Sequence, residues 1–238
     1  LAFSMKSEAK VTLPSILGDN MVLQQQAEVK LWGKARPNAT VTVKTSWNGQ
    51  TYKFSSDGKG GWSLTVSTPV AGGPYKIIFN DGELLTLQNV LIGEVWFCSG
   101  QSNMEMPMGC FDRQPVRGAN DIIAKAKPST PIRMYTTDSK DGRWVRQFSK
   151  TPAEDCQGEW LENTPVNVSH ISAVSYYFAR YIQEVLEVPV GIVVSTWGGS
   201  KVEAWMSRES IKPFSSIDLS ILDNDAEVKN PTATPCVL

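Results

Sequence analysis

Near its middle the chain reads Ile92-Gly93-Glu94-Val95-Trp96-Phe97-Cys98-Ser99-Gly100-Gln101-Ser102-Asn103-Met104, an apolar run that stops abruptly in a polar turn. Val95 to Cys98 are β-branched, aromatic or apolar at every position, which is typical of a strand buried on both faces of a parallel sheet. Gly100 then permits a sharp turn. Ser102 is therefore expected just past the carboxyl end of this strand, where open α/β sheets bind ligands and a hydroxyl can face substrate.

The turn around Ser102 also has a plain structural interpretation. Serines in Gly/Ser/Asn turns often hydrogen-bond only their own loop, so the pattern alone does not make Ser102 a nucleophile. The nucleophile elbow of α/β-hydrolases needs a glycine two residues after the serine, and Met104 stands there. The sequence therefore disfavours a lipase-type enzyme.

Composition excludes some function classes. The chain has 238 residues, 41% of them hydrophobic and 20% charged, which suffices for one large domain or two smaller ones. Lys and Arg total 23 against 24 Asp and Glu, so no strong field recruits nucleic acid or an anionic membrane. No apolar stretch approaches the roughly 20 residues that span a bilayer.

The first part of the chain has the period of half-buried strands. The runs, each broken by turn residues, are Val29–Gly33, Thr40–Lys44, Thr51–Phe54, Trp62–Val66 and Tyr75–Phe79. Asn48-Gly49, Asp57-Gly58 and Asp81-Gly82 predict hairpin turns between them. We therefore predict an antiparallel β-sandwich, or jelly roll, over residues 1–91. Its Trp32, Trp47 and Trp62 can stack on sugars, but aromatics in alternating strands are more often core, so we interpret this part as a scaffold.

The period changes over residues 92–238, where an α/β domain is expected. Candidate parallel strands are Val95–Cys98, Ile132–Tyr135 and Ile192–Ser195, and candidate helices are Asp121–Ala126 and Ile171–Val188, with Ser169 or Ser172 capping the second helix. The stretch 137–168 is expected to run over the sheet as a long excursion, of the kind that often shapes a substrate cleft.

Three segments together resemble the sialate O-acetylesterase family of SGNH-like carbohydrate esterases. They are Gly100–Met104 with its strand, the helix around Ser172–Arg180, and Pro189–Ser200 followed by Glu203–Ser207. The resemblance extends over nearly the whole chain, with the three motifs in the family's order. It implies a β-domain followed by the front part of an SGNH/flavodoxin-like α/β domain, and a serine hydrolase that removes acetyl groups from sugars.

The resemblance also assigns roles to residues of the two turns. Ser102 is the implied nucleophile, and its own N–H is one oxyanion donor. Gly198 or Gly199 supplies a second donor, since a glycine lets the backbone come close to substrate. Gln101, Asn103 and Trp197 are the implied substrate-binding residues. Without the resemblance, the two glycines are as well explained by a plain turn, and Trp197 by packing.

The catalytic base is the difficulty. His170 is the only histidine, and it is expected at the start of the long helix, where the family does not place its catalytic histidine, so we interpret it as a helix-terminal residue. In the family, the catalytic histidine comes a few residues after an aspartate, and a Gln-Gly-Glu-Ser-Asn-like block completes the oxyanion hole. Neither of these two patterns is found in this sequence. We therefore expect the front part of a larger enzyme, with its missing C-terminal segment supplied as a second chain, cut off by proteolysis or lost to a premature stop, and nearly inert alone.

Two function classes remain open at this point. One is a carbohydrate O-acetylesterase, with 9-O-acetylated sialic acid as the first candidate substrate and acetylated xylan or another hemicellulose as the alternative. The other is a non-catalytic carbohydrate-binding remnant, which the missing base favours. The sequence predicts neither a cofactor nor a metal. Cys98, Cys110, Cys156 and Cys236 permit either disulfides or free thiols, with Cys98 expected in the core. By resemblance, a periplasmic or secreted location is expected.

Overall fold

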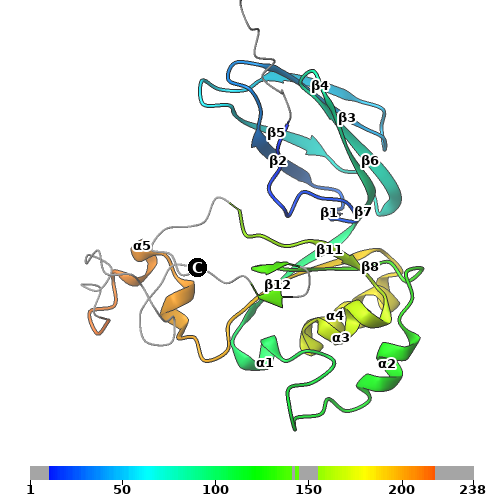
Figure 1. Cartoon of the computed structure of the whole chain (residues 1–238), viewed down its shortest axis with the longest axis vertical. Coiled ribbons are helices and arrows are strands. Elements are labelled where there is room, and N and C mark those ends of the chain that lie inside the picture. The colour runs from blue at the N-terminus through cyan, green and yellow to red at the C-terminus, as the bar shows by residue number, and fades with distance from the viewer. Residues whose placement is uncertain (1–10, 141–142, 145–154, 218–238) are drawn as a thin grey trace, which may run out of the picture.

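The structure, a computed structural model, describes residues 11–140, 143–144 and 155–217. Figure 1 shows a β-rich upper part and a lower part in which helices lie against a sheet. A single strand, β7 (Leu84–Gly100), passes from one part into the other, and the boundary predicted between residues 91 and 92 lies inside it. The chain thus has a mixed α/β fold, in which one large mixed sheet is accompanied by small two-stranded antiparallel sheets.

The upper part consists of two sheets. β4 (Thr51–Ser55), β3 (Thr40–Thr45), β6 (Gly72–Asn80) and β7 pair antiparallel in that order, while β2 (Glu28–Lys34) pairs with β5 (Gly61–Ser67) in a separate sheet. Asn48-Gly49 and Asp81-Gly82 therefore join paired strands, as predicted. The hairpin expected at Asp57-Gly58 is wrong, because β4 and β5 belong to different sheets. There the Asp57 carboxylate instead accepts the backbone N–H groups of Lys59 and Gly61, both at 2.8 Å, which lowers the pKa of Asp57.

Side chains of the two sheets meet in one core. Leu31 and Val66 of the small sheet are fully buried in the same cluster as Val43 and Phe79 of the large sheet. Trp62 belongs to this cluster, with its ring centroid 5.8 Å from that of Phe79. The scaffold interpretation holds for Trp62, whereas Trp32 is 38% exposed.

The lower part contains three parallel strands. β8 (Ile132–Thr136) and β12 (Val190–Thr196) run parallel to the end of β7, and β11 (Trp160–Glu162) pairs antiparallel with β8. In the flavodoxin-like order the first strand lies between the second and the third. Here the third parallel strand, β12, lies between β7 and β8, so the described strands do not follow that order.

Short elements complete the described chain. A short strand, β1 (Val22–Gln24), pairs parallel with β7, and β9 (Ser139–Lys140) pairs antiparallel with β10 (Arg143–Trp144). The helices are α1 (Ser102–Glu105), α2 (Ala119–Lys125), α3 (Pro165–His170), α4 (Ala173–Leu186), the 3₁₀ turn η1 (Val202–Trp205) and α5 (Arg208–Ile211). None of the helices within the described ranges is long and apolar enough to span a membrane.

Helix α4 begins where its sequence predicts and buries one face. The Ser172 hydroxyl caps it by accepting the Ser175 N–H at 3.2 Å, which confirms the cap expected there. Tyr176 and Ala179 then lie in a second core cluster with Ile132 and Ile192 of the sheet. On the other face of the sheet, Tyr135, Trp160 and Val193 join the core of the upper part. The two parts are therefore packed against each other as well as joined by β7.

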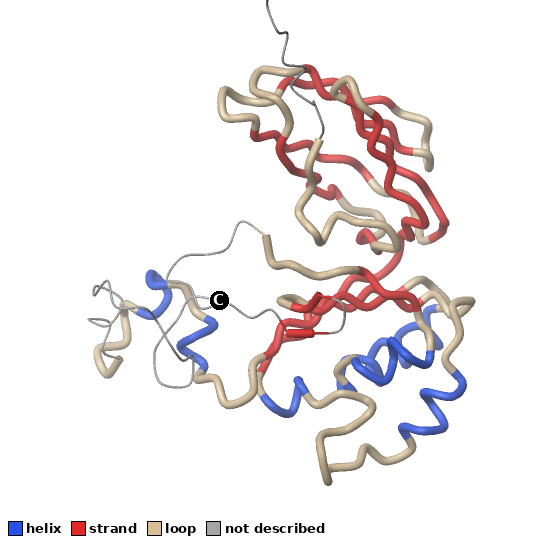
Figure 2. Tube along the Cα trace, viewed as in Figure 1, coloured by secondary structure: helices blue, strands red, loops and turns tan. Residues whose placement is uncertain are grey.

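The end of β7 differs from the sequence prediction. Trp96 and Phe97 are 42% and 68% exposed, so the strand is not buried on both faces. Between Glu94 and Gly100 it pairs with β12, and within the described residues no strand pairs with its other edge. Figure 2, in which strands are red, shows β7 running out from the upper sheet into this position. Trp96 packs edge-on against Phe178 of α4 at 5.0 Å, which extends the apolar surface onto that helix.

Candidate active site

Ser102 lies at the first residue of α1, immediately after the turn that ends β7. At Gly100 the backbone has φ +154°, and a Cβ there would come within 3.2 Å of the Met104 Cβ. Glycine thus lets the chain turn sharply into α1. Ser102 is exposed, and its hydroxyl forms no hydrogen bond within the described residues. The predicted placement past the carboxyl end of the strand is correct, and the hydroxyl is open to a ligand.

A second turn, Trp197–Ser200, lies beside α1 because β12 runs parallel to β7 and ends level with it. Three hydrogen bonds hold the two turns together. The Trp197 N–H donates to the Gly100 carbonyl at 3.1 Å, and the Gln101 side-chain amide donates to the Ser200 carbonyl at 3.2 Å. The third runs from the Gly198 N–H to Oε2 of Glu105. Residues nearly a hundred positions apart in sequence are thereby held in one site.

The two glycines of this turn have different surroundings. A Cβ at Gly198 would lie 3.7 Å from the Ser102 Cβ and 3.2 Å from Glu105 Oε2, so Gly198 lies beside the candidate nucleophile. Gly199 is exposed and has φ +76°, a conformation that favours glycine in the turn. The sequence left both open as oxyanion donors, and the geometry favours Gly198.

Glu105 is a site residue that sequence reasoning missed. Ser102-Asn103-Met104-Glu105 matches the capping-box pattern, in which the glutamate folds back onto the start of its own helix. Instead, the half-buried carboxylate of Glu105 reaches across to the other turn and accepts the Gly198 N–H. A carboxylate oxygen of Glu105 therefore occupies the backbone donor of Gly198.

The other predicted site residues lie around the same two turns. Gln101 is exposed, but its amide nitrogen is used to hold the Ser200 carbonyl. Asn103 is exposed and forms no hydrogen bond within the described residues, so its amide is open to a ligand. Trp197 is half-buried, and its carbonyl accepts the Ser200 hydroxyl at 2.7 Å. Trp205 donates its indole N–H to that same hydroxyl at 2.8 Å, which fixes the back of the turn.

His170 lies elsewhere. It is the last residue of α3, a separate short helix, and so does not begin the long helix α4. It is exposed, forms no hydrogen bond with Ser102, and lines a cavity of about 430 Å³ that also contains Glu105. The described residues thus place no hydrogen-bonded base on the Ser102 hydroxyl.

The described residues give no metal or disulfide chemistry to this site. No group of three or more His, Cys, Asp or Glu side chains within residues 11–140, 143–144 and 155–217 gathers as a metal site would require. Cys98, Cys110 and Cys156 are free thiols, and Cys236 lies outside the described residues. Cys98 is buried in the lower core, as predicted, and this burial raises the pKa of its thiol.

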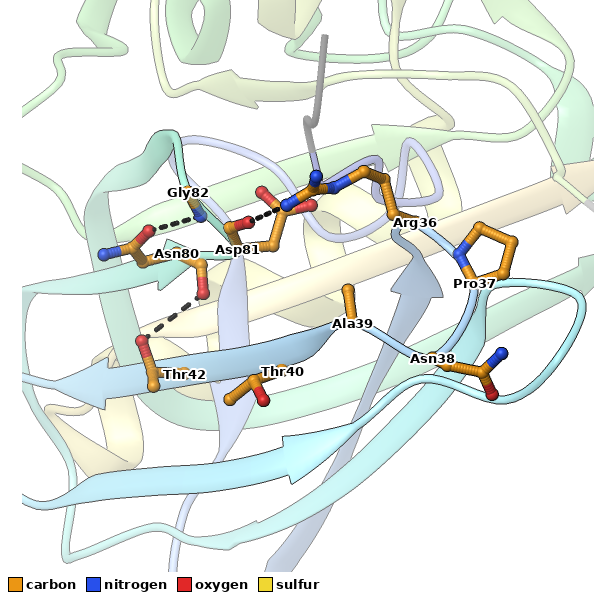
Figure 3. Close-up of a pocket in the computed structure, with 9 residues that line it drawn as sticks. All are labelled: Arg36, Pro37, Asn38, Ala39, Thr40, Thr42, Asn80, Asp81 and Gly82. Carbon is orange, nitrogen blue, oxygen red and sulfur yellow. Dashed lines mark hydrogen bonds between the residues drawn. The ribbon is translucent and has the colours of Figure 1, made fainter. Parts of the chain in front are cut away.

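A second hollow lies in the upper part, away from Ser102. Figure 3 shows this pocket of about 570 Å³, lined by polar residues of β3 and of the turn between β6 and β7. An Arg36 Nη2 donates to the Asp81 carbonyl at 3.1 Å, and the Thr42 hydroxyl donates to the Asn80 carbonyl at 3.4 Å. The Asp81 side chain is buried, and its carboxylate accepts no hydrogen bond from the described residues. This hollow lies apart from the two turns that contain Ser102 and Gly198.

The Glu105–Gly198 contact makes a prediction for reactivity. Glu105→Gln keeps an acceptor for the Gly198 N–H but removes the charge, and hydrogen bonds to charged groups are stronger than neutral ones by about 1 to 1.5 kcal/mol. The oxyanion that forms at the acetyl carbonyl when Ser102 attacks should therefore displace glutamine more easily. We expect the rate of Ser102 acetylation by 4-nitrophenyl acetate, followed by mass spectrometry, to rise about tenfold.

Glu184→Gln, an exposed glutamate on α4, is the matched control and should leave the rate of acetylation unchanged. A slower acetylation of Glu105→Gln would show instead that the carboxylate assists the reaction by holding the turn.

Comparison with known proteins gives the chain's relatives. No family model matches it. It is 29% identical over 216 residues to the sialate O-acetylesterase of Homo sapiens, a match that covers 83% of this chain and 39% of that protein. It is 30% identical over 213 residues to the sialate O-acetylesterase of Rattus norvegicus, a match that covers 83% of this chain and 38% of that protein. The crystal structure of a carbohydrate acetylesterase from Xanthomonas citri matches with a TM-score of 0.77 and 32% identity, over 90% of this chain and 46% of that one. The resemblance is confirmed: the chain is homologous to these esterases over most of its length, and it spans less than half of theirs.

Proposed function

We propose that this chain carries the nucleophile of a serine-dependent carbohydrate O-acetylesterase. The observation that carries the proposal is the open hydroxyl of Ser102 at the end of β7, beside Gly198. Homology to carbohydrate acetylesterases supports an acetylated sugar as the substrate. The printed names of the animal relatives support O-acetylated sialic acid, and acetylated hemicellulose is the alternative.

The proposed reaction uses groups from both turns. The Ser102 oxygen attacks the acetyl carbonyl while a base takes the hydroxyl proton, and the carbonyl oxygen becomes an oxyanion. The N–H groups of Ser102 and Gly198 stabilise this oxyanion once Glu105 has left Gly198, and each such donor is worth about 2.7 to 4 kcal/mol of barrier. Collapse expels the sugar oxygen, which regains a proton from the base. Water then releases acetate from the acetylated serine.

We further propose that the base comes from a C-terminal segment, on a second chain or on a longer polypeptide, which completes an SGNH-like domain behind the β-sandwich. Two observations support this. The chain covers 38% to 46% of its relatives, and the free edge of β7 presents Trp96 and Phe97 to solvent. An open edge with apolar side chains is a site for pairing with a further strand.

A labelling experiment tests the proposed nucleophile. The chain is incubated with 4-nitrophenyl acetate, digested, and mapped by mass spectrometry, and the acetyl group is expected on Ser102. Acetate release from O-acetylated sugars is then measured for the chain alone and with the segment added. Turnover that needs the segment and proceeds through Ser102 supports the esterase.

The second candidate is a non-catalytic carbohydrate-binding protein. It is favoured by the absence of a hydrogen-bonded base on Ser102 among the described residues and by the polar hollow around Asp81 (Figure 3). Binding of glycans without turnover, even with the C-terminal segment present, would establish this function and exclude the esterase.

A further inference from the structure

The cavity of about 430 Å³ beside α1 adjoins the Ser102 site. Glu105 belongs to both, because it lines the cavity and also accepts the Gly198 N–H next to Ser102. The remaining walls come from the end of β8, from residues around β11, and from α3. Part of the long excursion predicted from the sequence, including Glu159 and Asn167, therefore lines this cavity. Glu105 thus links the Ser102 site to this cavity.

The polar side chains that line this cavity are those of Glu105, Thr136, Ser139, Glu159, Asn167 and His170, which together offer several acceptors and some donors. Glu105 and Glu159 contribute carboxylates. The Asn167 side-chain nitrogen donates to the Glu162 carbonyl at 2.9 Å, and its Oδ1 accepts no hydrogen bond from the described residues. Such oxygens pair with hydroxyl groups, which donate. Met134 and Ile171 add apolar wall, the surface that the C–H face of a sugar ring packs against.

The charge of the cavity selects between sugars. An additional carboxylate entering this cavity meets the like charges of two carboxylates, Glu105 and Glu159, against one basic side chain, His170, among the described lining residues, so repulsion dominates. A neutral sugar meets acceptors for its hydroxyls without that repulsion. Resting on the proposed esterase function, we propose that this cavity is the subsite for an uncharged, hydroxyl-rich sugar unit of the acetylated substrate. Acetylated hemicellulose then fits the site better than sialic acid, which carries a carboxylate.

Binding to the intact chain with Ser102→Ala tests this without hydrolysis. The probes are an acetylated xylo-oligosaccharide and 9-O-acetylated N-acetylneuraminic acid, titrated by calorimetry and by ligand-observed NMR at low ionic strength. We expect the neutral sugar to bind at least about tenfold more tightly. Glu159→Gln should reduce the ratio of the two sugar affinities several-fold. Added salt should reduce that ratio too, because Glu159 is exposed and salt screens its charge. Glu83→Gln, an exposed glutamate in the upper part, is the matched control and should leave the ratio unchanged.

The outcomes separate this proposal from the esterase proposal. Equal or tighter binding of the sialic acid, a ratio unaffected by Glu159→Gln, or no binding of either sugar would overturn the subsite. The identity of the nucleophile is decided independently by the acetyl label on Ser102. If Ser102 is labelled and sialic acid is the better ligand, the proposed esterase function is supported and the proposed neutral-sugar subsite is wrong.

Discussion

Ser102→Ala is expected to abolish acetylation of the chain by 4-nitrophenyl acetate at the active site. In the enzyme completed by its C-terminal segment, it should lower acetate release from acetylated sugars about a thousandfold or more. Alanine has no oxygen to form the acyl intermediate, whereas the Gly198 N–H and the neighbouring cavity remain. The loss should therefore appear in kcat, with binding of the sugar retained. Intact-mass analysis and initial rates measure the two effects.

The same substitution should leave the fold intact. Ser102 is exposed and its hydroxyl bonds to no described residue, so the free energy of unfolding should change by less than about 0.5 kcal/mol. Ser63→Ala is the matched control, because Ser63 is an exposed serine on β5 whose hydroxyl likewise bonds to no described residue. A Ser102→Ala chain that is still acetylated at the wild-type rate would place the nucleophile elsewhere.

Much of this fold is readable from local pattern. The hydrophobic period marks the antiparallel strands, the parallel strands and α4, and the Ser172 cap fixes where α4 begins. These features depend on neighbours in sequence, which is why they can be predicted. The position of Ser102 follows in the same way, because a strand and its glycine turn are continuous in the chain.

Features that depend on distant pairing were not predictable. In the local sequence Glu105 occupies the glutamate position of a capping box. Only the parallel register of β7 and β12 brings Gly198 within reach of its carboxylate. The apolar residues Trp96 and Phe97 match a buried strand, but exposure depends on which strand pairs with the outer edge of β7. The hairpin predicted at Asp57-Gly58 failed for a similar reason, since a turn signal does not say whether the chain stays in one sheet.

Gly93→Ala is expected to destabilise the protein strongly. Gly93 is buried in β7, at the point where the strand passes from the upper sheet into the lower one. A Cβ there would stand 2.0 Å from the Pro189 carbonyl oxygen and 2.7 Å from its carbon, far inside contact distance. The clash is with backbone, so no side-chain rotation relieves it. The neighbouring Glu94 N–H also donates to that same carbonyl at 2.9 Å, which ties the two segments together.

β7 and the start of β12 must therefore separate to accept the methyl group, and the strand that carries Ser102 shifts with them. We expect the free energy of unfolding to fall by about 3 kcal/mol or more, and the melting temperature by about 6 to 12 °C. Thermal and urea unfolding measure the change, with Gly58→Ala as the matched control, because a Cβ at Gly58 meets nothing within 4 Å. If Gly93→Ala has the same melting temperature as Gly58→Ala and the parent chain, then β7 and Pro189 are not in close contact. The placement of Ser102 depends on that contact.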